Sequence, residues 1–243
     1  MKKQALRAIR LLKLFRPDQV ELSLADLSRL SGLNKTTTHR LLAALQSESF
    51  VDKDTSSGSY RLGTGVMALG VLALSGHGLR LRARPFLEQL AKESGETATL
   101  EVRIDDSMLI LDEVSGRHFL GAAGNIGTRW PLHATSTGKA VIAFDGHGAI
   151  ELGAELASLT PQTITERSRL QQQLAEVRRR GYAETVDELE EGFSGVAAVV
   201  RGRAGEVLGA LSVCGPTQRL PAARRAQFGT ELCRVADELR PRS

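Results

Sequence analysis

The stretch SLADLSRLSGLNKTTTHRLLAALQS, which runs from Ser23 to Ser47, decides the fold of the N-terminal part of this chain. Its residue types predict two short helices joined by a tight turn. Ser23 and Asp26 form the serine–acid pair of a helix N-terminus, where each side chain satisfies a free backbone N–H group. Gly32 permits the left-handed backbone at which the first helix ends. Asn34 then caps the second helix.

Apolar side chains recur at helical spacing along both predicted helices. The residues expected to face inward are Leu24, Leu27, Leu30, Leu33, Leu41, Leu42 and Leu45. The opposite face of the second helix carries, at its N-terminal end, Lys35, Thr36, Thr37, His39 and Arg40. A helix-turn-helix protein needs short donors and cations there, because this end of the recognition helix enters the major groove. An ordinary helical hairpin is the alternative, but the caps, the glycine and the apolar spacing all agree with a DNA reader.

The elements on both sides of this stretch predict a winged helix-turn-helix. Residues 3–16 predict a helix that ends before a proline. Its inward residues are expected to be Leu6, Ile9, Leu12 and Phe15. Residues 50–53 and 60–62 predict two short strands joined by a turn-rich connection. Lys53 and Arg61 lie where such a wing meets the phosphate backbone, and contacts of that kind position a protein on DNA.

Positive charge is concentrated in the same part of the chain. The 243 residues carry a formal net charge of +4. Residues 1–62 hold 11 Lys and Arg against 6 Asp and Glu, whereas residues 63–243 hold 21 against 22. A basic N-terminal region followed by a nearly neutral remainder is typical of a protein that binds nucleic acid phosphates. A solubilising face or an anionic membrane would also suit such a segment, but beside a helix-turn-helix we favour nucleic acid.

The sequence predicts no membrane or secretory segment. No apolar run approaches the roughly 20 residues that span a bilayer. Basic residues interrupt the apolar ones near the N-terminus, unlike in a signal peptide. Cys214 and Cys233 form no metal-spaced pair and fit a reducing compartment. We therefore expect a cytoplasmic protein that does not bind a membrane.

The remainder of the chain predicts an α+β domain behind a helical linker. The linker is apolar on all sides, which indicates packing against another chain or domain. From residue 97 the apolar period changes to that of strands. Strands are expected at 97–104, 108–114, 195–200 and 207–214, and helices at 79–94, 136–144, 166–180 and 221–239. Such an order predicts an antiparallel sheet with helices. The expected domains are 1–62, 63–78 for the linker, and 79–243.

Signatures of catalysis and of cofactor binding are weak. Gly138-Lys139-Ala140 resembles the end of a P-loop only superficially, because His133 stands where the first glycine belongs. A cluster of acids in a predicted loop could supply acid/base carboxylates, but we interpret it as a solvated face. Its members are Asp187, Glu188, Glu190 and Glu191. We find no nucleophile–base pair, metal-ligand cluster or cofactor fingerprint. The sequence therefore predicts a protein that is not an enzyme and that has no metal and no cofactor.

Residues 132–140 nevertheless favour a ligand site. Ser136 and Thr137 lie at the N-terminus of a predicted helix, where free N–H groups and the helix dipole attract an anion or a carboxylate. Simple helix capping would explain the same residues. Ser212 and Cys214 alternate on a strand and therefore face the same side. A pocket lined by these groups would suit a small polar ligand.

At these residues the chain resembles the IclR family of bacterial transcription regulators over nearly its whole length. The segments that carry the resemblance are LSLADLSRLSGLNKTTTHRLLAAL at 22–45, YRLG at 60–63, LHA at 132–134, GKA at 138–140, RGYA at 180–183, Glu188 and Gly192, and GALSVCGP at 209–216. The resemblance implies a winged helix domain and an effector domain related to GAF and PAS modules. It also implies homodimers through the N-terminal and linker helices, often paired into homotetramers, that bind palindromic promoter DNA as repressors or activators.

The resemblance also implies which residues bind the effector, a small organic or aromatic acid in this family. Carried over by position, they are Ser136, Thr137, Thr185, Gly195, Ser212 and Cys214, with apolar lining from 120–130. Responders to glyoxylate and pyruvate typically have Asp where Thr185 stands, Cys where Gly195 stands and Ser where Cys214 stands. These changes remove a charge and enlarge the space, so we expect a bulkier effector such as an aromatic carboxylate, a lactone or a semialdehyde. A constitutive DNA-binding regulator with a degenerate pocket is the alternative.

Overall fold

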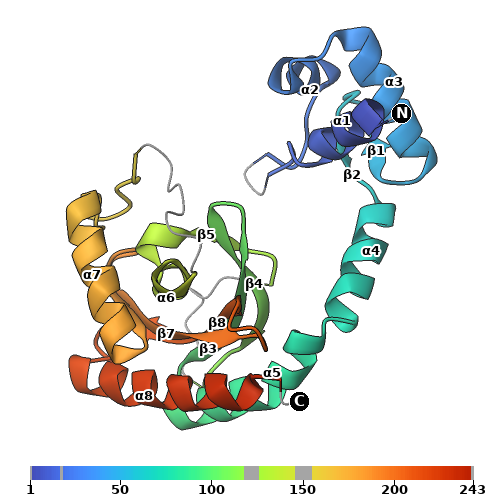
Figure 1. Cartoon of the computed structure of the whole chain (residues 1–243). Helices are drawn as coiled ribbons and strands as arrows, with labels where there is room; N and C mark the ends of the chain where they lie inside the picture. Colours follow the sequence, from blue (N-terminus) through green and yellow to red (C-terminus); the bar gives the residue numbers. More distant parts are fainter. Residues whose placement is uncertain (1, 17–18, 118–125, 146–154, 242–243) are drawn as a thin grey trace. The chain divides into compact units, whose positions relative to one another are not determined.

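The computed structural model describes residues 2–16, 19–117, 126–145 and 155–241. The chain divides into two compact units, Met1–His77 and Gly78–Ser243, and each has its own core. The fold is α+β, as predicted: the first unit is mainly helical, and the second contains a six-stranded antiparallel sheet (Figure 1).

The first unit is a winged helix-turn-helix followed by a further helix. Its elements are α1 (Lys2–Leu12), α2 (Leu24–Ser31), α3 (Lys35–Ser47), β1 (Val51–Lys53), β2 (Tyr60–Leu62) and α4 (Thr64–Ser75). The predicted caps are confirmed. Ser23 Oγ accepts a hydrogen bond from Asp26 N at 3.1 Å, and Gly32 ends α2 with a φ of 68°. Asn34 Oδ1 accepts from Thr37 N at 2.8 Å and so begins α3.

The core of this unit differs in part from the predicted apolar faces. Its buried members are Leu11, Leu22, Leu27, Leu41, Leu42, Val51 and Tyr60. Leu6 and Ile9, which were expected to face inward, are 55% and 52% exposed, and Leu30 is 43% exposed. Leu11, which the predicted face omits, is fully buried. Packing of α1 against α3 decides which side of α1 turns inward, and the spacing of residues along a single helix does not reveal that choice.

α4 exposes apolar side chains on several sides and contains no buried residue. The large exposed ones are Met67, Leu69, Val71 and Leu72. Among the described residues, no single helix is long and apolar enough to span a membrane, and α4 meets that test only when joined to α5 (Gly78–Ser94). Several large apolar side chains exposed on one helix are typical of a contact with another protein chain.

The second unit is built on a sheet with the strand order β5-β4-β3-β8-β7-β6, in which all neighbours are antiparallel. The strands are β3 (Thr97–Ile104), β4 (Ser107–Val114), β5 (Arg129–Pro131), β6 (Ala183–Val186), β7 (Phe193–Arg201) and β8 (Val207–Pro216). α5 and α8 (Ala222–Leu239) cover one face of the sheet. α6 (Ser136–Phe144) and α7 (Arg167–Arg180) lie on the other face (Figure 1).

The predicted strands and helices of this unit are confirmed, with ends that differ by a few residues. The edge strands β5 and β6 were not predicted. β5 has only three residues and contains Pro131, and β6 has only four. Their neighbours β4 and β7 supply the hydrogen-bonding partners that make them strands. The β6–β7 register places Thr185 opposite Gly195, so this pairing brings two predicted pocket residues together.

Candidate functional site

The N-terminal end of α3 presents the predicted DNA-reading residues to solvent. Its exposed side chains are Lys35, Thr36, His39 and Arg40. Thr37 is half-buried, and its backbone N–H is engaged by the Asn34 cap. Thr38 turns inward and is fully buried, and its hydroxyl donates to the backbone oxygen of Asn34 at 3.0 Å. At this end of α3, Thr38 therefore faces the core, whereas the cations and hydrogen-bond donors face solvent.

The wing presents its two predicted cations in a similar way. Lys53 and Arg61 are both exposed and lie on the antiparallel strands β1 and β2. The Lys53 ammonium lies 5.6 Å from the centre of the Tyr60 ring, a cation–π distance that orients the side chain. Asp54 Oδ1 accepts from the backbone N of Ser57 at 2.7 Å and fixes the turn between the strands.

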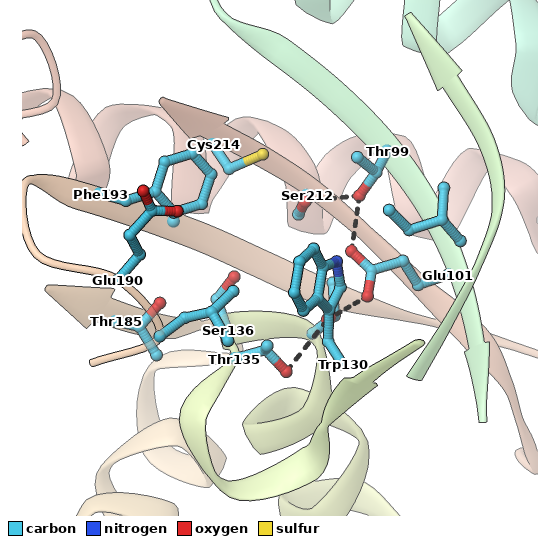
Figure 2. Close-up of a pocket in the computed structure, with 14 residues that line it drawn as sticks. Thr99, Glu101, Trp130, Thr135, Ser136, Thr185, Glu190, Phe193, Ser212 and Cys214 are labelled. Atoms are coloured by element: carbon cyan, nitrogen blue, oxygen red, sulfur yellow. Dashed lines mark hydrogen bonds between the residues drawn. The ribbon is translucent and has the colours of Figure 1, made fainter. Parts of the chain in front are cut away.

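All six predicted pocket residues line one cavity in the second unit, between the sheet and the N-terminal end of α6 (Figure 2). The other lining residues are Thr99, Glu101, Ile110, Trp130, Thr135, Leu189, Glu190 and Phe193. Side chains on a strand alternate between faces, so β3 and β8 each contribute a pair two residues apart. Of the apolar lining expected from 120–130, Trp130 is present, and 120–125 lie outside the described residues.

The most unusual member of the cavity lining is a buried carboxyl that the sequence analysis missed. Glu101 is only 5% exposed. Thr99 Oγ1 donates to its Oε1 at 2.9 Å, and Thr137 Oγ1 donates to its Oε2 at 2.7 Å. The hydroxyl oxygens of Thr99 and Ser212 are 2.7 Å apart. Because the Thr99 hydroxyl already donates to Glu101, the Ser212 hydroxyl is the donor in this second hydrogen bond. Burial raises the pKa of Glu101 above its usual value, and the two threonine hydrogen bonds oppose that shift in part.

The N-terminus of α6 forms the wall opposite the sheet. Thr135 caps this helix, because its Oγ1 accepts from Gly138 N at 3.1 Å. A Cβ at Gly138 would lie 2.2 Å from the backbone oxygen of Leu132, so only glycine allows this close approach. The first N–H groups of a helix have no partner within the helix. The helix end therefore offers the cavity the anion-attracting groups that the sequence predicts.

The space expected at Gly195 is taken by a neighbouring side chain. A Cβ built at Gly195 would lie 2.9 Å from Ser136 Oγ and 3.6 Å from Thr185 Oγ1. The missing side chain therefore does not enlarge the cavity as expected at this point, because the serine hydroxyl occupies that space. Burial, and then the nearby Glu101, raise the pKa of the Cys214 thiol far above its usual value. The raised pKa favours the neutral thiol at this wall of the cavity.

A second buried carboxyl holds the loop that closes the cavity. Lys139 on α6 is fully buried, and its Nζ lies 2.5 Å from both carboxyl oxygens of Glu188. The interpretation of residues 187–191 as a solvated face is therefore wrong for Glu188, although Glu190 and Glu191 are exposed. The ion pair joins α6 to the loop that carries Leu189 and Glu190 into the cavity lining.

Other candidates from the sequence have structural roles. His133 is buried and its Nε2 lies 2.9 Å from the backbone oxygen of Ala157. No group of three or more His, Cys, Asp and Glu that would hold a metal ion occurs in the described part of the chain. Strand alternation in 97–104 placed Thr99 and Glu101 on one face, but the sequence did not show that this face borders α6.

Two family models match the chain. Residues 4–55 match the IclR helix-turn-helix domain, and residues 71–240 match the C-terminal domain of bacterial transcriptional regulators of the IclR type. The glycerol operon regulatory protein of Streptomyces griseus is 37% identical over 216 residues, which cover 88% of this chain and 85% of that protein.

Solved structures agree with these matches. An IclR transcriptional regulator from Alicyclobacillus acidocaldarius is 29% identical, with a TM-score of 0.82 and coverage of 98% of this chain and 97% of that one. An IclR homologue from Microbacterium hydrocarbonoxydans, solved in complex with 4-hydroxybenzoate, is 26% identical, with a TM-score of 0.76 and coverage of 97% and 98%.

Proposed function

The chain belongs to the IclR family of bacterial transcriptional regulators, and on that basis we propose that a small effector bound in the cavity controls its affinity for promoter DNA. The observation that supports this most directly is the cavity itself, where six residues from α6, β6, β7 and β8 converge. In this proposal residues 1–62 bind DNA, 63–78 link the domains, and 79–243 bind the effector and oligomerise. Such a regulator works in the cytoplasm, where promoter DNA is.

The proposed effector is a small organic or aromatic acid, or a related lactone or semialdehyde. The N-terminal end of α6 favours a carboxylate. Trp130 and Phe193 supply aromatic surface for a ring. The Microbacterium homologue was solved in complex with 4-hydroxybenzoate, which supports a ligand of that kind. The effector would act by binding more tightly to one of two arrangements of the DNA-binding domains. The factor by which the effector changes operator affinity then equals the factor by which the operator changes effector affinity.

Fluorescence anisotropy tests this function on labelled DNA from the upstream region of the protein's own gene. Salt-sensitive, specific binding that one compound of an acid and lactone panel shifts by about 5- to 150-fold would support the proposal. Specific binding that no compound shifts would favour the constitutive regulator. A compound that binds the cavity also raises the melting temperature, whereas a degenerate pocket gives no such shift.

Filling the cavity is expected to abolish the effector response without changing DNA binding. In Gly195→Val the new Cβ would lie 2.9 Å from Ser136 Oγ, so the serine side chain has to move and the ligand loses room. We expect at least a tenfold loss of effector affinity by calorimetry and an unchanged operator Kd. Ala223→Val, on the exposed surface of α8, is the matched control and should respond normally. A normal effector response in Gly195→Val would show that the effector binds elsewhere.

We also propose that the protein is a homodimer, or a homotetramer of two such dimers, that reads palindromic DNA. The exposed apolar residues of α4, together with Leu6 and Ile9 of α1, support a contact with a second copy. Met67→Glu/Leu72→Glu should convert the dimer to a monomer in sedimentation analysis, because the contact would bury two charges without partners. Ser75→Glu, an exposed polar position on the same helix, is the control. An unchanged dimer in the double variant would place the interface elsewhere.

A further inference from the structure

The effector cavity holds a buried carboxyl but no cation. None of the cavity residues that the structure describes is Lys, Arg or His. Glu101 lies at the sheet side of the cavity with both oxygens accepting threonine hydroxyls (Figure 2). An ionised carboxylate effector beside Glu101 would therefore meet a like charge in a site of low polarisability. Ionising both carboxyl groups there costs free energy.

The groups that surround Glu101 increase this effect. From β4, the half-buried Glu113 lies close enough to interact with Glu101, and the charge of Glu101 helps to raise the pKa of Glu113. From β8 comes the neutral Cys214 thiol, from the closing loop Glu190, and from α6 hydroxyl groups and the positive end of the helix dipole, which is weaker than a full charge. Three cations of the same unit are engaged by other acids: Lys139 by Glu188, Arg219 by Glu96, and Arg84 by Asp112.

We propose that Glu101 determines the charge of the ligand that this cavity accepts, so that an acid effector enters together with one proton, which the Glu101 carboxyl holds. This inference rests on the proposed function, in which the cavity is the effector site. The proton comes from solvent, and the Glu101 O–H then donates to the ligand carboxylate. A protonated Glu101 needs an acceptor for its O–H, and a ligand carboxylate is a stronger acceptor than the hydroxyl oxygens of Thr99 and Thr137, which lie 2.9 and 2.7 Å from the Glu101 oxygens. The ligand carboxylate supplies that acceptor, and two carboxyl groups then share one proton.

The consequence is a defined dependence of affinity on pH and on ligand charge. Below the pKa of Glu101 the proton is already present, so the affinity for an acid does not depend on pH. Above that pKa each pH unit lowers the affinity about tenfold, because binding must take up a proton. An uncharged ligand of the same skeleton donates its hydroxyl to the ionised Glu101 and shows no such loss.

Isothermal titration calorimetry of the full chain at pH values from about 6 to 9 tests the proposal. The probes are two pairs that differ only in charge: 4-hydroxybenzoate with 4-hydroxybenzyl alcohol, and glycerate with glycerol. Titrations in two buffers of different ionisation enthalpy count the protons taken up. We expect close to one proton per acid at alkaline pH and none per alcohol.

Glu101→Gln is the decisive variant, because its amide has the same shape, carries N–H donors and cannot ionise. It should bind the acid with an affinity independent of pH, at least tenfold tighter than the wild type at the alkaline end, and should bind the alcohol more weakly. Glu191→Gln removes an exposed carboxyl from the same loop, outside the cavity lining, and is the matched control. It should keep the wild-type pH dependence.

The outcomes separate the two proposals. An acid affinity that does not depend on pH in the wild type, or an acid-to-alcohol ratio that Glu101→Gln leaves unchanged, would overturn the role of Glu101 while leaving the cavity as the effector site. Acid binding that persists in Gly195→Val would place the ligand outside the cavity and overturn the proposed function. Failure of all four compounds to bind both the wild type and Glu101→Gln would count against both.

Discussion

Replacement of Lys139 by methionine is expected to destabilise the unit of residues 78–243 by about 3–5 kcal/mol. Methionine fills a similar volume, so the loss comes from charge and not from a cavity. In the wild type the Lys139 ammonium lies 2.5 Å from both oxygens of Glu188, which is 5% exposed. Without the lysine, that carboxylate stays buried without its ion partner. Urea unfolding followed by the fluorescence of Trp130, the only tryptophan of the chain and part of this unit, measures the change.

Two further variants show whether the unpaired charge is the cause. Lys139→Met/Glu188→Leu removes both charges and should recover most of the lost stability, because replacing a buried ion pair by apolar residues is often neutral. Arg179→Met breaks an ion pair with Glu176 on the exposed side of α7, and it should change the stability by less than about 1 kcal/mol. If Lys139→Met lowers the free energy of unfolding by less than about 1 kcal/mol, water must replace the lysine beside Glu188. That result would contradict the burial of Lys139 and Glu188.

Replacement of Arg40 by alanine is expected to weaken operator binding by about 1–3 kcal/mol, which corresponds to a loss of about 5- to 150-fold. Arg40 is exposed on the outward face of α3, so the substitution removes a DNA contact without opening the core. Lys35→Ala should weaken binding more evenly across DNA sequences and reduce the salt slope by about one, as expected for a phosphate contact. Anisotropy titrations on operator and random DNA at several salt concentrations measure both effects.

Two controls accompany this result: the melting temperatures of the variants and the substitution of an exposed lysine in the other unit. The melting temperatures of both variants should match the wild type, because neither side chain is buried. Lys92→Ala, an exposed change on α5 in the other unit, should leave DNA binding unaltered. Full operator affinity in the double variant Lys35→Ala/Arg40→Ala would exclude the N-terminal end of α3 as the reading surface.

Local sequence determined most helices and strands of this protein and four residues of the candidate site, Ser136, Thr137, Ser212 and Cys214. Ser23, Gly32 and Asn34 mark helix ends because their capping hydrogen bonds involve residues only three positions away. The alternation in β8 likewise places Ser212 and Cys214 on one face, and both line the cavity. The resemblance to a family added Thr185 and Gly195, which no local pattern singles out.

Only the tertiary structure decided which of these groups meet. Glu101 contacts Thr137 across 36 positions, and Lys139 contacts Glu188 across 49, so both contacts depend on strand register and helix packing. Local patterns therefore did not reveal the Glu101 carboxyl, and they led us to expect a solvated Glu188. The same reason explains Leu6 and Ile9, whose helical spacing is regular although α3 packs against another side of α1. Periodicity shows that a helix has an apolar side, but the neighbour in space decides which residues are buried.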